Sequence, residues 1–148
     1  MRSELLASGF SDRERVFPRR VRYFVLAILT IVVGLIVHFD GRVLSFRVRD
    51  ILGDALWAMM MVWWMGVALP RVRLSVRGLA AFGICVVVEL SQRYHTPSLD
   101  AARLTIPGQL ILGSGYDPRD FLSYAAGVIV ALALAQVVVE SGDRRAAV

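Results

Sequence analysis

The chain has 148 residues, of which 57% are hydrophobic, and its mean hydropathy is +0.61. A soluble domain of this size cannot bury so much apolar surface, so the composition predicts a membrane protein. The 17 basic residues are all arginine and give a net charge of +5, but they lie between long apolar runs without any recognised binding module. We therefore expect no nucleic-acid partner. The only cysteine, Cys85, excludes an internal disulfide.

The N-terminal residues, 1–20, are polar and rich in arginine, and we expect them to form a cytoplasmic tail. Pro18 favours a helix that begins just after it. The first apolar run then covers about 21–38, which is long enough to span a bilayer. Because a long charged leader precedes this run and no small-residue cleavage site accompanies it, the run is interpreted as a retained anchor.

Three further apolar runs follow, at about 51–69, 78–95 and 120–140. The predicted fold class is all-α: a polytopic membrane protein with a four-helix membrane domain over 21–140 and a cytoplasmic tail over 141–148. If both termini and the 70–77 loop share one side, that side holds eleven arginines and the other side holds six. Arginine is retained on the cytoplasmic side, so both termini are predicted to be cytoplasmic.

One apolar segment is too short to cross the membrane. Residues 101–113, "AARLTIPGQLILG", contain Pro107 and Gly108, which are predicted to interrupt any helix there. The segment is expected either to lie at the interface as an amphipathic helix or to enter the membrane and return. The sequence leaves both alternatives open.

Acidic and amide side chains gather toward one leaflet in this topology. They are Asp54 near one end of the second helix, Glu89 and Gln92 in the third, and Asp120 at the start of the fourth. Helical spacing places small residues on the same faces as these groups: Gly78, Ala81, Cys85, Glu89 and Gln92 in the third helix, and Asp120, Tyr124, Gly127, Ala131 and Ala135 in the fourth. Small residues let membrane helices approach closely, so these faces are predicted to point inward.

A carboxylate in hydrocarbon costs about 2.5 to 3.5 kcal/mol and usually has a partner. Arg93 follows Glu89 at the favourable i, i+4 spacing, and Arg103 of the short segment is expected to reach the same region. This predicts either a structural charge cluster or a ligand site. Asp54 and Asp120 have a further interpretation, as acids in the first turn of a helix or as a helix cap.

No motif for a metal, a cofactor or a nucleophile is present. His38 and His95 lie on different predicted helices without a metal-ligand spacing, so we expect neither a metal nor a cofactor. The stripe of Trp57, Met61 and Trp64 is interpreted as packing or lipid-facing surface. Catalytic residues therefore stay unknown.

Three stretches resemble an uncharacterised bacterial membrane family known as domain of unknown function 2809: "GDALWA" at 53–58, "ELSQ" at 89–92, and "DAARLTIPGQLILGSGYDPRDFLSYAAG" at 100–127. The matching positions are Gly53, Asp54, Glu89, Gln92, Asp100, Arg103, Gly108, Leu112, Gly113, Asp120, Tyr124 and Gly127. The chain departs from the family pattern after its first helix, where "GLIVHFDGR" offers only Arg42 or His38 in place of an earlier arginine.

The resemblance implies a location in the bacterial inner membrane and no known activity. A more distant likeness in helix layout is to VanZ-like proteins, which carries no function across. The leading hypothesis is that Glu89, Gln92, Arg103, Asp54 and Asp120 bind the headgroup of a lipid or an envelope precursor at the outer leaflet, with structural or packing roles for Gly53, Gly108, Gly113, Tyr124 and Gly127. Two alternatives stay open: a membrane-embedded enzyme with Glu89 or Asp120 as general base, and a structural subunit that associates with other helices through Gly127, Ala131 and Ala135.

Overall fold

The computed structural model describes residues 2–40, 44–113 and 115–140. Its elements, in chain order, are α1 (Arg2–Asp40), α2 (Phe46–Ala68), α3 (Leu74–Ser91), α4 (Pro97–Arg103), α5 (Ile106–Leu112), α6 (Asp120–Leu134) and a π-helical turn, η2 (Ala135–Glu140). The described residues contain no strand, so the predicted all-α class is confirmed. Arg42 and the predicted tail at 141–148 lie outside the described residues.

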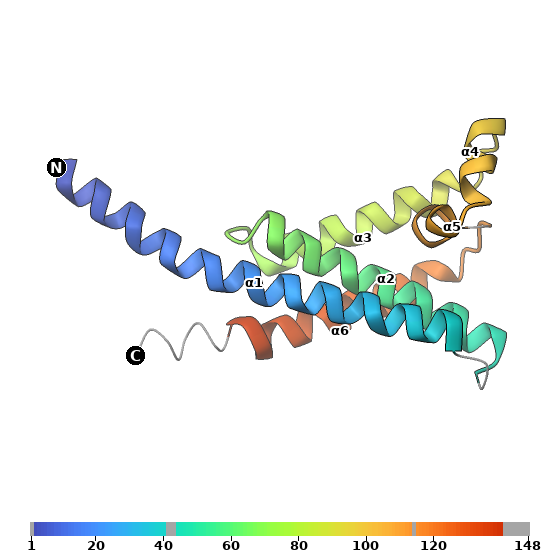
Figure 1. Ribbon diagram of the computed structural model, residues 1–148, viewed down its shortest axis with the longest axis horizontal. Helices are drawn as coiled ribbons and strands as arrows, with labels where there is room; N and C mark the ends of the chain where they lie inside the picture. Colours follow the sequence, from blue (N-terminus) through green and yellow to red (C-terminus); the bar gives the residue numbers. More distant parts are fainter. Residues whose placement is uncertain (1, 41–43, 114, 141–148) are drawn as a thin grey trace.

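Four helices are long and apolar enough to cross a membrane: Val16–Phe39, Phe46–Ala68, Leu74–Ser91 and Asp120–Val139. Figure 1 shows them as an elongated bundle, with the start of α1 and the end of the last described turn, η2, at the same end. We call this the terminal end. The opposite end, which carries α4, α5 and the loop 113–119, is called the loop end. The bundle is built around α2, which packs against α1, α3 and α6.

The first helix is longer than the sequence predicted. It begins at Arg2 and continues through Pro18, so the expectation of a helix that starts after this proline is wrong. A proline inside a helix costs about 3 kcal/mol, because it removes one backbone hydrogen bond and crowds the preceding turn. The remaining hydrogen bonds of the 39-residue helix α1 offset this local cost.

The contact between α1 and α2 combines close helix packing with a buried polar contact. Trp63 of α2 is fully buried and donates its indole N–H to the hydroxyl of Thr30 in α1 at 3.0 Å. A Cβ atom at Gly66 would overlap the ring of Tyr23, and one at Gly127 would overlap the backbone carbonyl of Ala55. Glycine at these positions therefore lets α1 and α6 approach the backbone of α2.

The start of α2 corrects one interpretation of Asp54. Ser45 is the N-cap residue, and its hydroxyl accepts a hydrogen bond from the Val48 N–H at 3.4 Å. The helix thus begins at Phe46, which places Asp54 more than two turns inside it. A first-turn role against the helix dipole is therefore wrong for Asp54.

The short apolar segment forms two helices, each with a threonine N-cap and an early proline. Thr96 caps α4 and precedes Pro97, while Thr105 caps α5 and precedes Pro107 by two residues. Pro107 belongs to the first helical turn, where its missing N–H is unneeded, so the predicted interruption at Pro107 is wrong. The interruption lies at Leu104–Thr105.

The short helices α4 and α5 lie across the axis of the bundle and expose apolar side chains. Figure 1 shows both helices crosswise to the long axis of the bundle, with α4 past the end of α3 and α5 beside its last turns. Leu104, Ile106 and Ile111 are exposed on them. Apolar side chains on helices that lie across the bundle axis are typical of a segment that rests in the membrane interface.

Candidate functional site

Glu89 is the centre of a polar network at the loop end. It lies in the last turn of α3 and is fully buried, as its small-residue stripe predicted. Its Oε1 accepts a hydrogen bond from the main-chain N–H of Asp117 at 2.8 Å. Its Oε2 accepts two more, from the Tyr124 hydroxyl at 2.9 Å and from the Gln92 amide at 3.1 Å. Three donors within the chain therefore satisfy this carboxylate.

Gln92 extends the network to the loop that precedes α6. Its side-chain oxygen accepts a hydrogen bond from the N–H of Gly115 at 3.0 Å. Gly113 has a φ of 68° in this loop, and a Cβ atom there would overlap the Gln92 side chain. Both the backbone conformation and the lack of space therefore require glycine at position 113.

Arg103 lies beside this network but has other partners than predicted. Its guanidinium donates to the carbonyl oxygens of Tyr94 and Ser91, each at 2.8 Å, and lies 3.4 Å from the Asp100 carboxylate. The expected meeting of Arg103 with the buried acids is wrong. The Ser91 carbonyl also accepts a turn hydrogen bond from the Tyr94 N–H at 2.9 Å, and α4 positions Arg103 to donate to this carbonyl and to that of Tyr94 just past the end of α3.

Arg93 is not the partner of Glu89 either. Its guanidinium lies over the Tyr116 ring, 5.3 Å from the ring centroid. Because α3 ends at Ser91, the i, i+4 geometry of a continuous helix is lost at Arg93. Among the described side chains, the ion pairs at the loop end are those of Asp100 with Arg103 and with His95.

Asp54 and Asp120 form a second polar group at the same end. Their carboxyl groups interact directly, and Asp50 lies near enough to act on both electrostatically. Oδ2 of Asp54 is buried and has no hydrogen-bond partner. Within the described part of the chain, neither acid forms an ion pair with an arginine. This pair therefore differs from Glu89, whose oxygens are satisfied.

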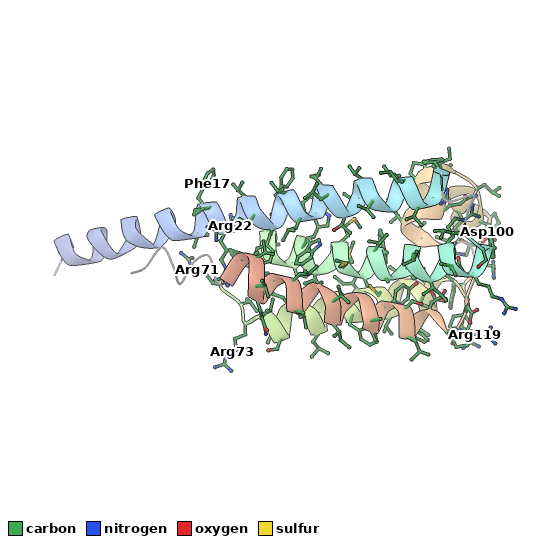
Figure 2. All side chains as sticks on the ribbon, turned by 90° about the horizontal axis from the view of Figure 1, so that it is seen from below. Phe17, Arg22, Arg71, Arg73, Asp100 and Arg119 are labelled. Atoms are coloured by element: carbon green, nitrogen blue, oxygen red, sulfur yellow. The ribbon has the colours of Figure 1, made fainter. Side chains whose placement is uncertain are left out.

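The role of Asp120 as a helix cap is not observed. The N-cap residue of α6 is Arg119, which makes no side-chain capping bond, and Asp120 occupies the first turn. The carboxyl of Asp120 is directed instead toward Asp54 across the α2–α6 contact. Figure 2 shows Asp100 and Arg119, which flank this region, at the loop end of the bundle.

The predicted packing positions have different surroundings. Gly108 is buried, and a Cβ atom there would overlap the Ala102 carbonyl, while Tyr124 and Gly127 are buried in the α6 interface. A side chain at Gly53 would meet open space, so the structure gives Gly53 no packing role. Ala131 and Ala135 are fully buried inside this chain. The face of Gly127, Ala131 and Ala135, which was predicted to associate with other helices, is thus packed against the protein's own helices.

Sequence reasoning missed the backbone donors of the network. The N–H groups of Gly115 and Asp117 donate hydrogen bonds to the side chains of Gln92 and Glu89. A pattern of side chains in the sequence does not reveal such main-chain donors. The sequence signal that could have indicated such a turn is the glycine-rich "GSGYDP" at 113–118. No group of three or more histidine, cysteine or acidic residues in the described chain is arranged to hold a metal ion.

The four apolar helices and the inward-facing polar groups at one end define a multi-pass α-helical membrane protein. The family described as a protein of unknown function (DUF2809) matches residues 43–128, and the chain belongs to that family. The match includes α2 to α5 and the first half of α6, and so includes every residue of the polar network. No solved structure matches the fold.

Proposed function

We propose that the protein binds an amine-bearing headgroup of a membrane lipid or envelope precursor at the loop end, through Asp54 and Asp120. The observation that carries this proposal is the buried Oδ2 of Asp54, which has no hydrogen-bond partner and lies beside a second carboxyl group. Two adjacent acids without a cation repel each other when both are ionised. An ammonium group supplies three donors and one positive charge, so it can donate to both acids and reduce their repulsion.

In this proposal the five predicted ligand residues have two different tasks. Asp54 and Asp120 contact the headgroup. Glu89, Gln92 and Arg103 form the frame around it, because their polar atoms bind the 113–119 loop and the end of α3. A frame of satisfied hydrogen bonds keeps ligand-contacting groups at fixed positions.

A general-base role is less well supported. Both oxygens of Glu89 accept hydrogen bonds from within the chain, which favours a positioning role for this residue. Asp120 stays a candidate base in the enzymatic alternative, with the Asp54 carboxyl beside it, but no hydroxyl or thiol nucleophile is among the groups described as acting on it. The headgroup-binding proposal needs no such group.

The test is lipid retention by the full chain in neutral detergent, measured by native mass spectrometry with short-chain phosphatidylethanolamine. The wild type is expected to retain this lipid over its N-acetylated form, which keeps the phosphate but has no ammonium. The double variant Asp54→Asn/Asp120→Asn is expected to lose at least about ten-fold in affinity, in the range for a lost charged hydrogen bond.

Asp100→Asn provides the control, because Asp100 is an acid at the same end whose contacts are to His95 and Arg103. It is expected to retain the lipid. Equal retention of the two lipid forms by the wild type would contradict the proposal. So would unchanged retention by a folded Asp54→Asn/Asp120→Asn variant.

A further inference from the structure

The described charges are separated between the two ends of the bundle. In the ranges 16–22, 70–77 and 135–139, which belong to the terminal end, the structure describes six arginines and no acid. Residues 44–54 and 89–120, at the loop end, hold five arginines and six acids. The terminal end thus carries a net +6 and the loop end a net −1 in these ranges. This separation produces a basic surface on one side of the membrane.

The arginines of the terminal end lie where the apolar spans begin and end. Arg20 lies close to the start of the first span at Val16, and Arg71 and Arg73 immediately precede the third span at Leu74. Figure 2 shows Arg22, Arg71 and Arg73 at one end of the bundle together with Phe17. The level at which apolar spans end is the level of the lipid headgroups.

The arginines of the terminal end differ in exposure. Arg20, Arg71 and Arg73 are exposed. Arg77 is 1% exposed and stacks over the Tyr23 ring at 4.9 Å, and the guanidinium of Arg22 donates to the Val139 carbonyl at 3.1 Å. Phe17 is 71% exposed at the same end, as is typical of an aromatic side chain in the interface.

We propose that Arg20, Arg71 and Arg73 form a belt that binds the phosphate groups of anionic lipids at the terminal end. Guanidinium groups bind phosphate oxygens through paired, charge-assisted hydrogen bonds. The belt is separate from the acid pair at the loop end in position, in charge and in ligand. It draws anionic lipid to the leaflet opposite the proposed amine site.

The test compares two double variants that remove the same charge from opposite ends. Arg20→Gln/Arg73→Gln changes the belt, and Arg47→Gln/Arg119→Gln removes two exposed arginines of the loop end. The probe is short-chain phosphatidylglycerol, titrated against phosphatidylcholine into the full chain in neutral detergent and followed by native mass spectrometry. A basic residue near an anionic surface contributes roughly five-fold in affinity, so the belt variant is expected to bind phosphatidylglycerol about twenty-five-fold more weakly.

The loop-end variant is expected to lose less than about two-fold. Arg20→Lys/Arg73→Lys is expected to keep most of the binding, because lysine and arginine contribute similarly to electrostatic attraction by an anionic surface. Equal losses in both glutamine variants would overturn the proposal, as would equal wild-type binding of the two lipids. Displacement of the lipid by equimolar glycerol phosphate would overturn the lipid assignment and indicate a site for soluble phosphate. Thermal unfolding identifies a misfolded variant. If the glutamine variant of the belt is misfolded, Arg20→Lys/Arg73→Lys provides the test: retained selectivity for phosphatidylglycerol supports the belt, and loss of that selectivity in a folded protein contradicts it.

Discussion

The main-chain N–H of Asp117 donates to Oε1 of Glu89 at 2.8 Å, across 28 residues of sequence. This bond connects the last turn of α3 to the loop that leads into α6. The other oxygen of Glu89 receives the Tyr124 hydroxyl from α6 itself. One buried carboxylate therefore fixes the position of the segment on which Asp120 lies.

Glu89→Gln is expected to lower the free energy of unfolding by about 2 to 4 kcal/mol, because it removes the charge from three hydrogen bonds and replaces one acceptor by a donor. Thermal unfolding in detergent measures this loss. Tyr124→Phe removes a single donor and is expected to cost about 1 to 2 kcal/mol. If the two changes were fully additive in the double variant, the Glu89–Tyr124 bond would be energetically unimportant.

Gly127→Ala is expected to destabilise the fold by about 1 to 3 kcal/mol, because its Cβ atom would overlap the Ala55 carbonyl in α2. Gly83→Ala is the matched control, since a Cβ atom at Gly83 meets nothing within 4 Å. It is expected to be neutral or to stabilise by up to about 1 kcal/mol through helix propensity. Equal melting temperatures for the two variants would show that the α2–α6 approach does not need glycine.

Arg103→Lys is expected to loosen α4 and α5, since a lysine ammonium cannot reproduce the two separate bonds to the carbonyls of Ser91 and Tyr94. Hydrogen–deuterium exchange should rise in residues 94–112 while α1 and α2 stay protected. The control is Arg119→Lys, whose side chain is exposed. Unchanged exchange in Arg103→Lys would show that contacts other than those of Arg103 hold α4 and α5 at the end of α3.

The predicted orientation, with both termini in the cytoplasm, predicts a different labelling result at each end of the bundle. In a Cys85→Ala background, Ser98→Cys in α4 should react with a membrane-impermeant maleimide in intact cells. Ser75→Cys, in the first turn of α3 at the terminal end, should react only after permeabilisation. Cys85 itself is fully buried and should be unreactive in the folded protein. The reverse pattern at the two serine positions would contradict cytoplasmic termini.

Much of the fold could be predicted because hydropathy and helical period are local properties. The four apolar runs became four helices, and the stripe that contains Ala81, Cys85 and Glu89 faces inward as its spacing indicated. Helix limits were less predictable. With Ser45 as its N-cap residue, α2 begins at Phe46, before the apolar run at about 51, and α1 continues through Pro18. Capping and packing set the ends of helices more than hydropathy does.

The sequence by itself determined that this is a four-helix membrane protein and that Glu89 points into the bundle. Only the tertiary structure decided what Glu89 meets, since its partners include a backbone N–H 28 residues away, and Arg103 turned out to bind the end of α3 instead. The physical reason is that burial depends on nearby residues in the sequence, while the partners of a side chain depend on distant ones. Burial follows from the polarity and spacing of neighbouring residues, whereas hydrogen-bond partners are selected by distances of about 3 Å between segments that only the complete fold brings together.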